Sequence, residues 1–525
     1  MTTLAVLVAL LPFGGALAVA TGGRARGAGW ATALAGAATL AAAAVLAVRV
    51  VTGGPVRGWS GYVHVDALGA FFLVTVALVV LLASLGSAAY LRVEQDRGTL
   101  SALQVRVYFI AFAVFAAMML ASLETGNLGL LWVLVEASTL ASAVLVALEA
   151  RPTSLEAAWK YIIISSFGVT IALVATLFLF YAASALPLGA AERLTWPALA
   201  NSAGQHALRP DSLRLAFLLG VIGYGTKVGL APMHTWLPDA HAEAPSPASA
   251  MLSAALLNTG MYAIIRFRAI AAAALGSGYT SRVLLLFGFA SIVVGVLFMI
   301  RQANFKRLYA YSSIEHMGIV AAALGFGGTL GLYGALLHAL NHALAKAVAF
   351  LASGDVVLRY RTRSARRVRG TLTTAPFFGG VLLLASLALL GSPPFGLFLS
   401  ELTIVRAGFA HASPALAALL LALLAIAFVA LLQVAAGMAV GTGPLPSPGA
   451  ASGPGSGSGT GQEPGRGPSR PTTAVAAPAS PYRTRTLRLL AAAPLAGGMA
   501  LLLVLGLWVP HPLDSLILRS IEVIR

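Results

Sequence analysis

Ionisable side chains interrupt several long apolar stretches of this sequence. Glu136 lies in LLWVLVEASTLASAVLVAL, and Lys227 lies in FLLGVIGYGTKVGLAPMHTWLPDAH. Glu315 and His316 lie in LYAYSSIEHMGIVAAAL, and Glu401 lies in LLGSPPFGLFLSELTIV. An ionisable group at membrane depth costs several kcal/mol unless it is paired or hydrated. Each of these residues is therefore a candidate for a functional role.

A further stretch, GLYGALLHALNHALAKAVAFLAS, carries His338, His342 and Lys346. The spacing i, i+4, i+8 places the three side chains along one face of a helix. A zinc site and a pair of buried structural histidines are alternative interpretations, but the HExxH context and a neighbouring carboxylate are both missing. Histidine and a desolvated lysine both change protonation near neutral pH, so we favour a titratable row in a hydrated path and expect no metal.

Two of the apolar stretches contain helix-breaking residues. Gly229 and Pro232 fall in GTKVGLAP, and Pro393 and Pro394 fall in GSPPFG. Proline removes a helix donor and glycine loosens the turn, which predicts two helices broken inside the membrane. Five spans separate the breaks, so two oppositely oriented repeats with a site at the midplane are expected. Two ordinary kinks are the alternative interpretation.

These residues suggest a mechanism for moving protons. Glu136 is expected to face Lys227, two spans further along, and to hold the lysine in its charged form. When the carboxylate moves away or is neutralised, burial favours the neutral amine and the proton leaves. A water-linked chain of such groups would pass the proton on, with Glu401 as the terminal site near the far side.

The composition identifies the class of protein that positions these groups. Of 525 residues, 59% are hydrophobic and 10% are charged, with a mean hydropathy of +0.88. Soluble domains carry roughly 25% charged residues, so a water-soluble globular enzyme is excluded. About fourteen apolar segments predict an all-α polytopic membrane protein with two inverted five-helix repeats, each containing a broken helix. The chain has no cysteine, which excludes iron–sulfur clusters and thiolate metal sites, and we expect no cofactor.

The segments divide the chain into five regions. We expect three N-terminal helices, a first repeat (helices 4–8), a second repeat (helices 9–13), a disordered Gly/Pro/Ser linker, and a last helix with a tail. The boundaries are 1–103, 104–272, 282–440, 441–481 and 482–525.

Basic residues predict the orientation. Lys and Arg number 34 against 17 Asp and Glu, a net charge of +17. In a membrane protein this excess marks cytoplasmic loops, not nucleic-acid binding. Both termini are then expected on the outer side of the plasma membrane. The run at 359–369 is either a docking surface for a partner or an anchor beside anionic lipid. The richer side holds Arg24, Arg26, Arg92, Arg97, Arg301, Lys306, Arg307, Arg359, Arg361, Arg363, Arg366, Arg367, Arg369, Arg483, Arg485 and Arg488; the other holds roughly half as many, among them Arg57, Arg193, Arg209 and Arg282.

Four segments, in order, resemble the antiporter-like membrane subunits of respiratory complex I. They are TKVGLAPMHTWLPDAHAEAPSPASAMLSAALLNTGMYAIIRF, FKRLYAYSSIEHMG, HALNHALAKAVAFLASGDVV and GSPPFGLFLSELTIV. The family includes the Mrp cation/proton antiporter subunits and the membrane subunits of group 4 [NiFe]-hydrogenases. The resemblance covers about residues 65–440. The sequence IEHMG, together with Asn258, is most similar to the hydrogenase-4 component F branch.

The resemblance implies fourteen helices and roles for several residues. It implies that Glu136 and Lys227 are the pair of the input half-channel, and that Glu401 is the output residue. His338 and His342 would belong to the central relay. Lys160, in EAAWKYIIISSFG, matches a family lysine, although an interfacial lysine is an equal alternative. The implied partners are other membrane and peripheral subunits of a respiratory or hydrogenase complex, together with the lipid bilayer.

One departure from the family concerns the centre of the path. Asn258 stands where many complex I members carry lysine or histidine. Asparagine cannot titrate, so either water carries the proton there or the relay runs through Lys346 and His338. The sequence HTWLPDAH could hold a metal, but we interpret it as the end of a broken helix, with Asp239 as a cap and Pro238 as a helix stop.

Four functions remain open at this stage. We favour a proton-translocating, non-catalytic subunit of a redox complex of the NADH:quinone oxidoreductase or group 4 hydrogenase kind. The first alternative is an Mrp-type Na⁺/H⁺ antiporter subunit, which would need nearly the same residues. A quinone- or nicotinamide-binding enzyme is disfavoured because no G-x-G-x-x-G follows a strand. A partner of an inorganic-carbon uptake system is the last alternative.

Overall fold

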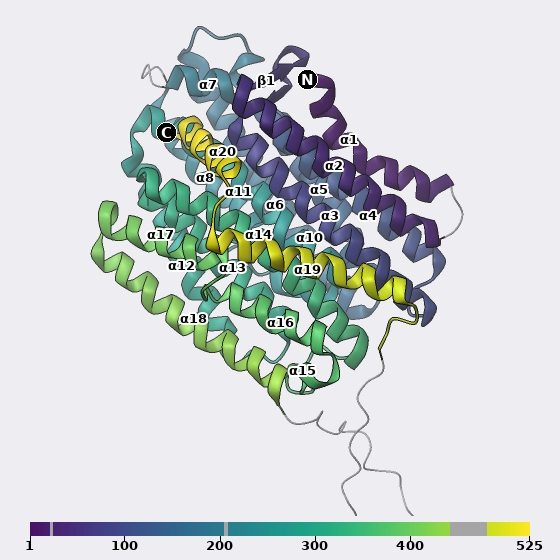
Figure 1. Cartoon of the computed structure of the whole chain (residues 1–525). Coiled ribbons are helices and arrows are strands. Elements are labelled where there is room, and N and C mark those ends of the chain that lie inside the picture. Colours follow the sequence, from purple (N-terminus) through teal and green to yellow (C-terminus); the bar gives the residue numbers. More distant parts are fainter. Residues whose placement is uncertain (22–24, 204–207, 442–479) are drawn as a thin grey trace, which may run out of the picture.

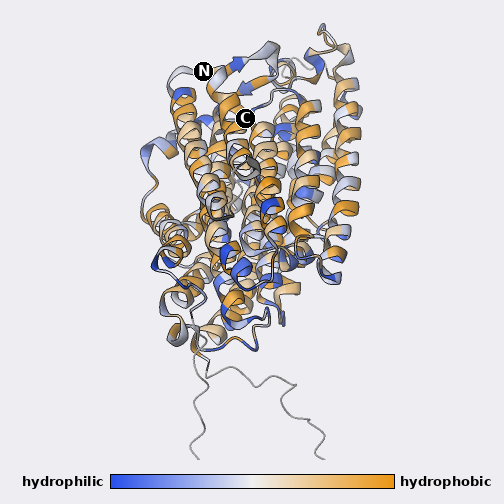
Figure 2. Cartoon of the chain, turned by 90° about the vertical axis from the view of Figure 1, so that its right-hand side faces the viewer, coloured by the Kyte–Doolittle hydropathy of each residue, from blue (hydrophilic) through white to orange (hydrophobic). Residues whose placement is uncertain are grey.

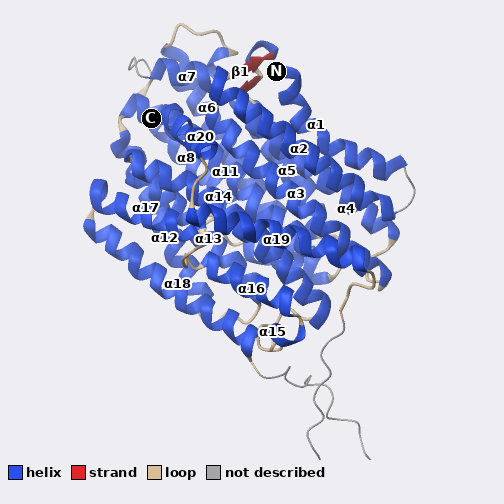
Figure 3. Cartoon of the chain, viewed as in Figure 1, coloured by secondary structure: helices blue, strands red, loops and turns tan. Residues whose placement is uncertain are grey.

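The computed structural model describes residues 1–21, 25–203, 208–441 and 480–525. Helices make up nearly all of it (Figure 3). Within these residues, 10 helices are long and apolar enough to cross a membrane, and two shorter apolar helices, Thr2–Ala18 and Pro376–Leu389, accompany them. The chain is therefore a multi-pass helical membrane protein.

The described part of the N-terminal half contains eleven α-helices and one small hairpin. Its two strands, β1 (Val56–Gly58) and β2 (Val63–Val65), are antiparallel. The helices of this half are α1 (Thr2–Thr21), α2 (Ala25–Gly53), α3 (Ala67–Asp96), α4 (Ala102–Glu124), α5 (Leu128–Val146), α6 (Pro152–Ala182), α7 (Trp196–Ala203), α8 (Pro210–Val228), α9 (Leu237–Glu243), α10 (Ser246–Met251) and α11 (Leu257–Leu275).

The C-terminal half also contains long helices and shorter ones. One turn of π-helix, Leu252–Leu256, joins α10 to α11, and another, Gly408–Ala412, follows α17. The helices of this half are α12 (Ser277–Met299), α13 (Phe305–Phe326), α14 (Gly328–Tyr360), α15 (Thr371–Thr374), α16 (Pro376–Leu389), α17 (Gly396–Ala407), α18 (Pro414–Val440), α19 (Arg485–Leu507) and α20 (His511–Ile524).

The helices run between two polar ends of the bundle. Hydrophobic colour dominates the middle of the molecule, and most of the hydrophilic colour gathers towards the two ends (Figure 2). The marks for the N- and C-termini, the β-hairpin and α7 lie at one end, which we call the hairpin end (Figure 1). The loop after α14 and the start of α19 lie at the opposite end, which we call the linker end.

Short polar side chains determine where several helices begin. Asp66 caps α3 by accepting a hydrogen bond from the Gly69 N–H, and Ser101 forms a capping box with Gln104 at α4. Asn127 and Asn304 cap α5 and α13 in the same way. Each cap satisfies N–H groups that have no partner inside the helix, which is costly to omit near a membrane.

A buried ion pair connects two distant parts of the hairpin end. Arg266, on α11, donates to both carboxylate oxygens of Asp66 at 2.9 and 2.6 Å. Its guanidinium also lies 3.7 Å from the centre of the Trp196 ring and 4.7 Å from that of Tyr262. A bidentate pair with aromatic faces on either side compensates much of the cost of burying both charges. It fixes the start of α3 against α11.

Several details were not expected from the sequence. The sequence predicted transmembrane helices and a linker, whereas the structure also contains the β-hairpin, α7 and the amphipathic helix α20. Pro238 was wrongly predicted to stop a helix: it lies in the first turn of α9, where its missing N–H costs nothing. The linker predicted over 441–481 falls almost wholly on residues 442–479, outside the described residues, as does Arg24.

The hairpin generates a prediction about stability and pH. His64 is 5% exposed, and burial lowers its pKa to about 4, against the opposing attraction of Asp66. Unfolded His64 takes up a proton near pH 6.5, whereas the folded side chain does so only near pH 4. The free energy of unfolding should therefore fall by about 3 kcal/mol as the pH drops through this interval. Melting temperatures in detergent should show this for the wild type, and less for His64→Gln.

The exposed His511 offers the matched control for this measurement. The His511→Gln variant should keep the pH dependence of the wild type. If His64→Gln also kept it, another group would be responsible.

Candidate functional site: a buried row of ionisable side chains

The first broken helix consists of α8 and α9. The α8 helix ends at Val228, and Gly229 takes the left-handed conformation (φ 78°) that favours glycine. Pro232 lies in the turn that follows. Two polar side chains hold the break: Ser291 Oγ accepts from the Ala231 N–H at 2.9 Å, and Trp236 Nε1 donates to the Thr226 carbonyl at 2.7 Å. Backbone groups freed by the break thus find partners within the protein.

Lys227 is fully buried and lies two residues before Gly229, at the end of α8. Its Nζ donates to the Tyr161 hydroxyl at 3.3 Å and lies 4.9 Å from the centre of the same ring. Tyr161 in turn contacts Ser142 Oγ at 2.7 Å, and its ring packs against Trp236 with centroids 4.6 Å apart. The Tyr161 hydroxyl therefore binds the amino group of Lys227 and connects it to Ser142 on α5.

Glu136 lies on α5 and is half-buried. Ser166 Oγ on α6 donates to one carboxylate oxygen at 2.6 Å, and Thr139 Oγ1 donates to the other at 3.4 Å. The charge of Glu136 acts on Lys227. No direct ion pair joins the two among the described residues, because Tyr161 is the hydrogen-bond partner of Lys227.

The second broken helix consists of α16 and α17. Pro393 and Pro394 lie in the break, and Gly391 takes a positive φ of 62°. A Cβ on Gly391 would overlap the Glu401 carboxylate, so glycine is needed here for close approach as well as for conformation. Gly396 likewise leaves room for the Asn341 side chain of α14. The break thus brings Glu401 against the backbone.

The row on α14 faces α13. His338, His342 and Lys346 are all fully buried. Lys346 Nζ donates to the Tyr309 carbonyl and to Ser312 Oγ, both at 2.7 Å. The ring of His316 on α13 lies 5.1 Å from that of His338 and 5.3 Å from that of His342. These contacts place every predicted member of the α14 row, with His316, in one buried cluster.

Glu315 and Glu401 form the far end of this cluster. Both line a cavity of about 10 Å³, space for roughly one water molecule, between α13, α16, α17 and α18. Glu401 also borders a larger, mostly apolar cavity of about 450 Å³ between α17 and α18. The charge of Lys346 acts on Glu315. Two carboxylates and one lysine thus share a region with little water, where they cannot all be charged at low cost.

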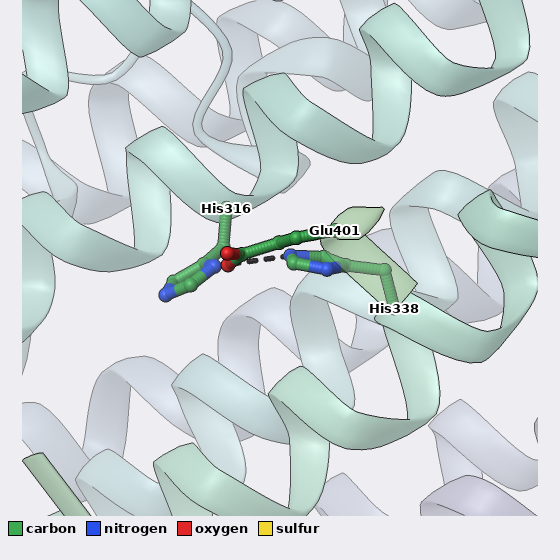
Figure 4. A group of neighbouring side chains, drawn as sticks. All are labelled: His316, His338 and Glu401. Carbon is green, nitrogen blue, oxygen red and sulfur yellow. Dashed lines mark hydrogen bonds between the residues drawn. The ribbon is translucent and has the colours of Figure 1, made fainter. Parts of the chain in front are cut away.

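Among the described residues, His316, His338 and Glu401 form the one group whose spacing could hold a cation. Their ligand atoms lie within 4.8 Å of one another, and the two rings and the carboxylate converge in Figure 4. His316 Nδ1 and His338 Nε2 are 3.0 Å apart and share a hydrogen bond, and Ser400 Oγ lies 3.0 Å from His338 Nδ1. The two histidine nitrogens cannot bind a metal ion while they share this proton.

Two amide side chains, Asn258 on α11 and Asn341 on α14, are fully buried, and Asn258 contacts α14. Asn258 Nδ2 donates to the Ala254 carbonyl at 2.7 Å and contacts the Ala339 carbonyl of α14 at 3.4 Å. Its Oδ1 has no hydrogen-bond partner among the described residues. The same is true of the side-chain nitrogen and oxygen of Asn341 and of the two ring nitrogens of His342. The amide nitrogen of Asn258 therefore contacts α14, while its oxygen is buried without a partner in the described part of the chain.

Lys160 lies apart from this row. Its side chain is 47% exposed and pairs with Glu156 at 2.6 Å and Asp239 at 3.3 Å. Asp239 also pairs with Arg307. The structure therefore corrects the prediction that Asp239 caps backbone donors, because its carboxylate binds two basic side chains instead. Among the described residues, no metal-type cluster includes His234, Asp239 or His241.

Four polar residues near these groups were not among the predicted site residues. Tyr161 and Ser166 stood in an apolar run with nothing to mark them. His241 was placed in a loop, yet it is fully buried, with its ring 5.5 Å from Phe350. Lys306 was assigned to the basic side, yet it is buried and donates to the Ala244 carbonyl at 2.6 Å. For His241 and Lys306 the sequence offered only their positions as a signal: His241 ends the motif PDAH, and Lys306 follows Asn304 by two residues.

The fold and this site define a class of protein: a multi-pass membrane protein with titratable side chains buried between two broken helices. A transmembrane family described as NADH:quinone oxidoreductase/Mrp antiporter matches residues 125–427. The chain belongs to this family, and the resemblance found in the sequence is confirmed.

Individual relatives narrow the comparison. A hydrogenase-4 component F homolog of Methylacidiphilum infernorum is 39% identical over 357 residues, which cover 68% of this chain and 74% of the relative. Hydrogenase-4 component B of Escherichia coli is 30% identical over 350 residues, 64% of this chain and 49% of the relative, so the chain spans about half the length of that protein. A chain of the Mrp complex from Dietzia sp. shares the fold, with a TM-score of 0.79 at 23% identity and coverage of 99% and 96%.

The position of Tyr161 yields a prediction. Tyr161→Phe keeps the ring that packs on Trp236 but removes the hydroxyl between Ser142 and Lys227. A hydrogen bond to a charged group contributes enough that its loss should slow proton transfer by about ten- to a hundredfold. Proton uptake into energised inverted vesicles, measured with a pH-sensitive dye, should show the decrease. Tyr279→Phe, which removes a 3.0 Å hydrogen bond to the Arg214 carbonyl elsewhere, is the control and should transport normally.

Proposed function

We propose that this chain is the proton-translocating membrane subunit of a redox complex of the hydrogenase-4 or NADH:quinone oxidoreductase kind. The observation that carries the proposal is the row itself: Lys227, the histidines of α13 and α14, and Glu401 are buried among the helices, and the charge of the half-buried Glu136 acts on Lys227. Burying so many ionisable groups is costly and has no structural benefit that apolar side chains would not supply better. The chain has no cysteine, so iron–sulfur electron carriers belong to partner subunits.

The proton step at the first break follows from the contacts. While Glu136 is ionised, its charge stabilises the ammonium form of Lys227. When Glu136 is neutralised, burial favours the neutral amine, and the Tyr161 hydroxyl is the nearest group that can relay the released proton. At the second break, His316 and His338 already share a hydrogen bond, and Glu401 accepts the proton at the far end.

Water must connect the two halves at Asn258. Each buried polar atom without a partner costs about 1–3 kcal/mol, and among the described residues Asn258, Asn341 and His342 carry such atoms. Water that satisfies them supplies a proton-conducting link where asparagine cannot. Lys346, held by Ser312 and the Tyr309 carbonyl, would then set the charge of the cluster and hand the proton to His338.

Two inverted repeats account for the arrangement of the charges. The first repeat, 104–272, contains α4, α5, α6, α8 and α11, and the second, 282–440, contains α12, α13, α14, α16/α17 and α18. The second member of each repeat carries a glutamate, Glu136 or Glu315. The broken fourth member of each carries an ionisable residue beside its break, Lys227 or Glu401. This correspondence supports fourteen spans in two opposed halves.

The orientation follows from the distribution of arginines. Arg97 donates to the Leu358 carbonyl, and Arg363 pairs with Glu243, so these basic loops gather at the linker end. The positive-inside rule then places the linker end in the cytoplasm. Both chain termini, which lie at the hairpin end (Figure 1), would be on the outer side of the plasma membrane.

The proposal predicts that two substitutions abolish pumping. Glu136→Gln removes the charge that controls Lys227, and Lys227→Ala removes the proton carrier itself. Either change should reduce proton transport of the intact complex to background, as measured with a pH-sensitive dye in membrane vesicles. Glu156→Gln alters an exposed glutamate that pairs with Lys160, and it should leave transport intact. Normal pumping by either of the first two variants would refute the relay.

An Mrp-type Na⁺/H⁺ antiporter subunit is the alternative, because the description of the matching family covers both NADH:quinone oxidoreductase and Mrp antiporter subunits. The two functions differ in what drives transport. Vesicles that pump protons only when an electron donor such as hydrogen or NADH is supplied support the redox complex. Proton movement driven by an imposed Na⁺ gradient alone supports the antiporter. Copurification of a [NiFe] large subunit would identify the hydrogenase branch.

A further inference from the structure

A cavity of about 560 Å³ opens at the linker end, and none of the residues that line it belongs to the buried row. It lies where the start of α2, the end of α3, the start of α4 and the start of α19 meet, at the lower right of Figure 1. Ligand pockets in proteins span about 300–1,000 Å³, so this cavity is large enough to hold part of a small amphiphile.

The lining of this cavity changes from polar to apolar with depth. Its polar side chains belong to the helix ends: Arg92, Gln95 and Asp96 on α3, and Arg483 and Thr484 just before α19. One or two turns deeper along the same helices, the lining becomes apolar. The apolar residues are Trp30, Ala88, Leu91, Val105, Phe109, Leu487 and Leu490. This gradient matches the passage from the headgroup region of a bilayer to its hydrocarbon.

The polar rim carries an excess of positive charge. Arg92 is paired with Asp96 at 3.0 Å, which leaves its charge balanced. Arg483 is exposed and has no ion-pair partner among the described residues. Arg485 and Arg488 follow on the exposed surface of the first turn of α19. The N-terminus of a 23-residue helix adds its own partial positive charge at the same place.

We propose that this cavity binds one anionic phospholipid of the cytoplasmic leaflet. Arg483 and the start of α19 would hold the phosphate, with Arg92 beside it, and the acyl chains would lie along Trp30, Phe109 and Leu490. Basic pockets between helices on the cytoplasmic side are suited to such headgroups, whereas a free phosphate would leave the apolar wall uncovered. The bound lipid joins α19 to the N-terminal helices.

Native mass spectrometry of the full-length chain in detergent tests the proposal. The protein is titrated with dioleoyl-phosphatidylglycerol, dioleoyl-phosphatidylcholine or inorganic phosphate. We expect the wild type to bind phosphatidylglycerol most tightly and the double variant Arg92→Gln/Arg483→Gln to bind it roughly thirtyfold more weakly. The double variant Arg282→Gln/Arg519→Gln, which removes the same charge at the hairpin end, is the control and should bind as the wild type does.

The other outcomes overturn the proposal in distinct ways. Equal affinity for the two lipids would show that the site does not recognise an anionic headgroup. Binding of inorganic phosphate as tight as that of phosphatidylglycerol would identify a simple anion site. Unchanged phosphatidylglycerol binding by the Arg92/Arg483 variant would place the lipid elsewhere or leave the cavity to a partner subunit. Melting curves in the same detergent confirm that each variant is folded.

Discussion

The cost of removing an ionised side chain from water governs this structure. The chain buries two lysines of the path, Lys227 and Lys346, with Glu315 and Glu401, in a bundle whose other side chains are mostly apolar. Each of these lysines has a protein partner: Tyr161 for Lys227, and Ser312 and a carbonyl for Lys346. These partners are neutral, so they orient the lysine side chain without the strong attraction by which an ion pair would hold its proton. A full ion pair such as Asp66–Arg266 fixes structure instead.

The broken helices expose backbone groups inside the membrane, and ionisable side chains lie beside them. An intact helix satisfies all of its own backbone groups and offers none to a passing proton or a side chain. At the first break, Trp236 and Ser291 form hydrogen bonds with the backbone groups of Thr226 and Ala231. The Trp236 ring also packs against Tyr161, the partner of Lys227. At the second break, Gly391 lets the Glu401 carboxylate approach the chain. Each break therefore positions one ionisable group in the interior.

The two halves solve the same problem with different chemistry. In the first half, the hydroxyl group of Ser166 binds Glu136 and the hydroxyl group of Tyr161 binds Lys227. The second half uses a histidine cluster, in which His316 and His338 share one hydrogen bond. Asn258, Asn341 and His342 carry buried polar atoms that have no hydrogen-bond partner among the described residues and that water would satisfy. Control of hydration at these side chains would be a direct way to couple transport to events in partner subunits, since proton movement through water stops when the water leaves, without any ionisable group moving.

The sequence by itself determined the membrane class, the broken segments and the identity of most ionisable groups, because an interruption of long apolar runs is visible without any knowledge of contacts. Hydropathy could not locate Tyr161, His241 or Lys306, whose importance depends on which helices become neighbours. It also could not separate Lys160, half-exposed and paired with Asp239, from the buried lysines. Tertiary structure alone decided that Lys227 meets a tyrosine and not Glu136, because side-chain partners across helices depend on packing, which no local pattern records.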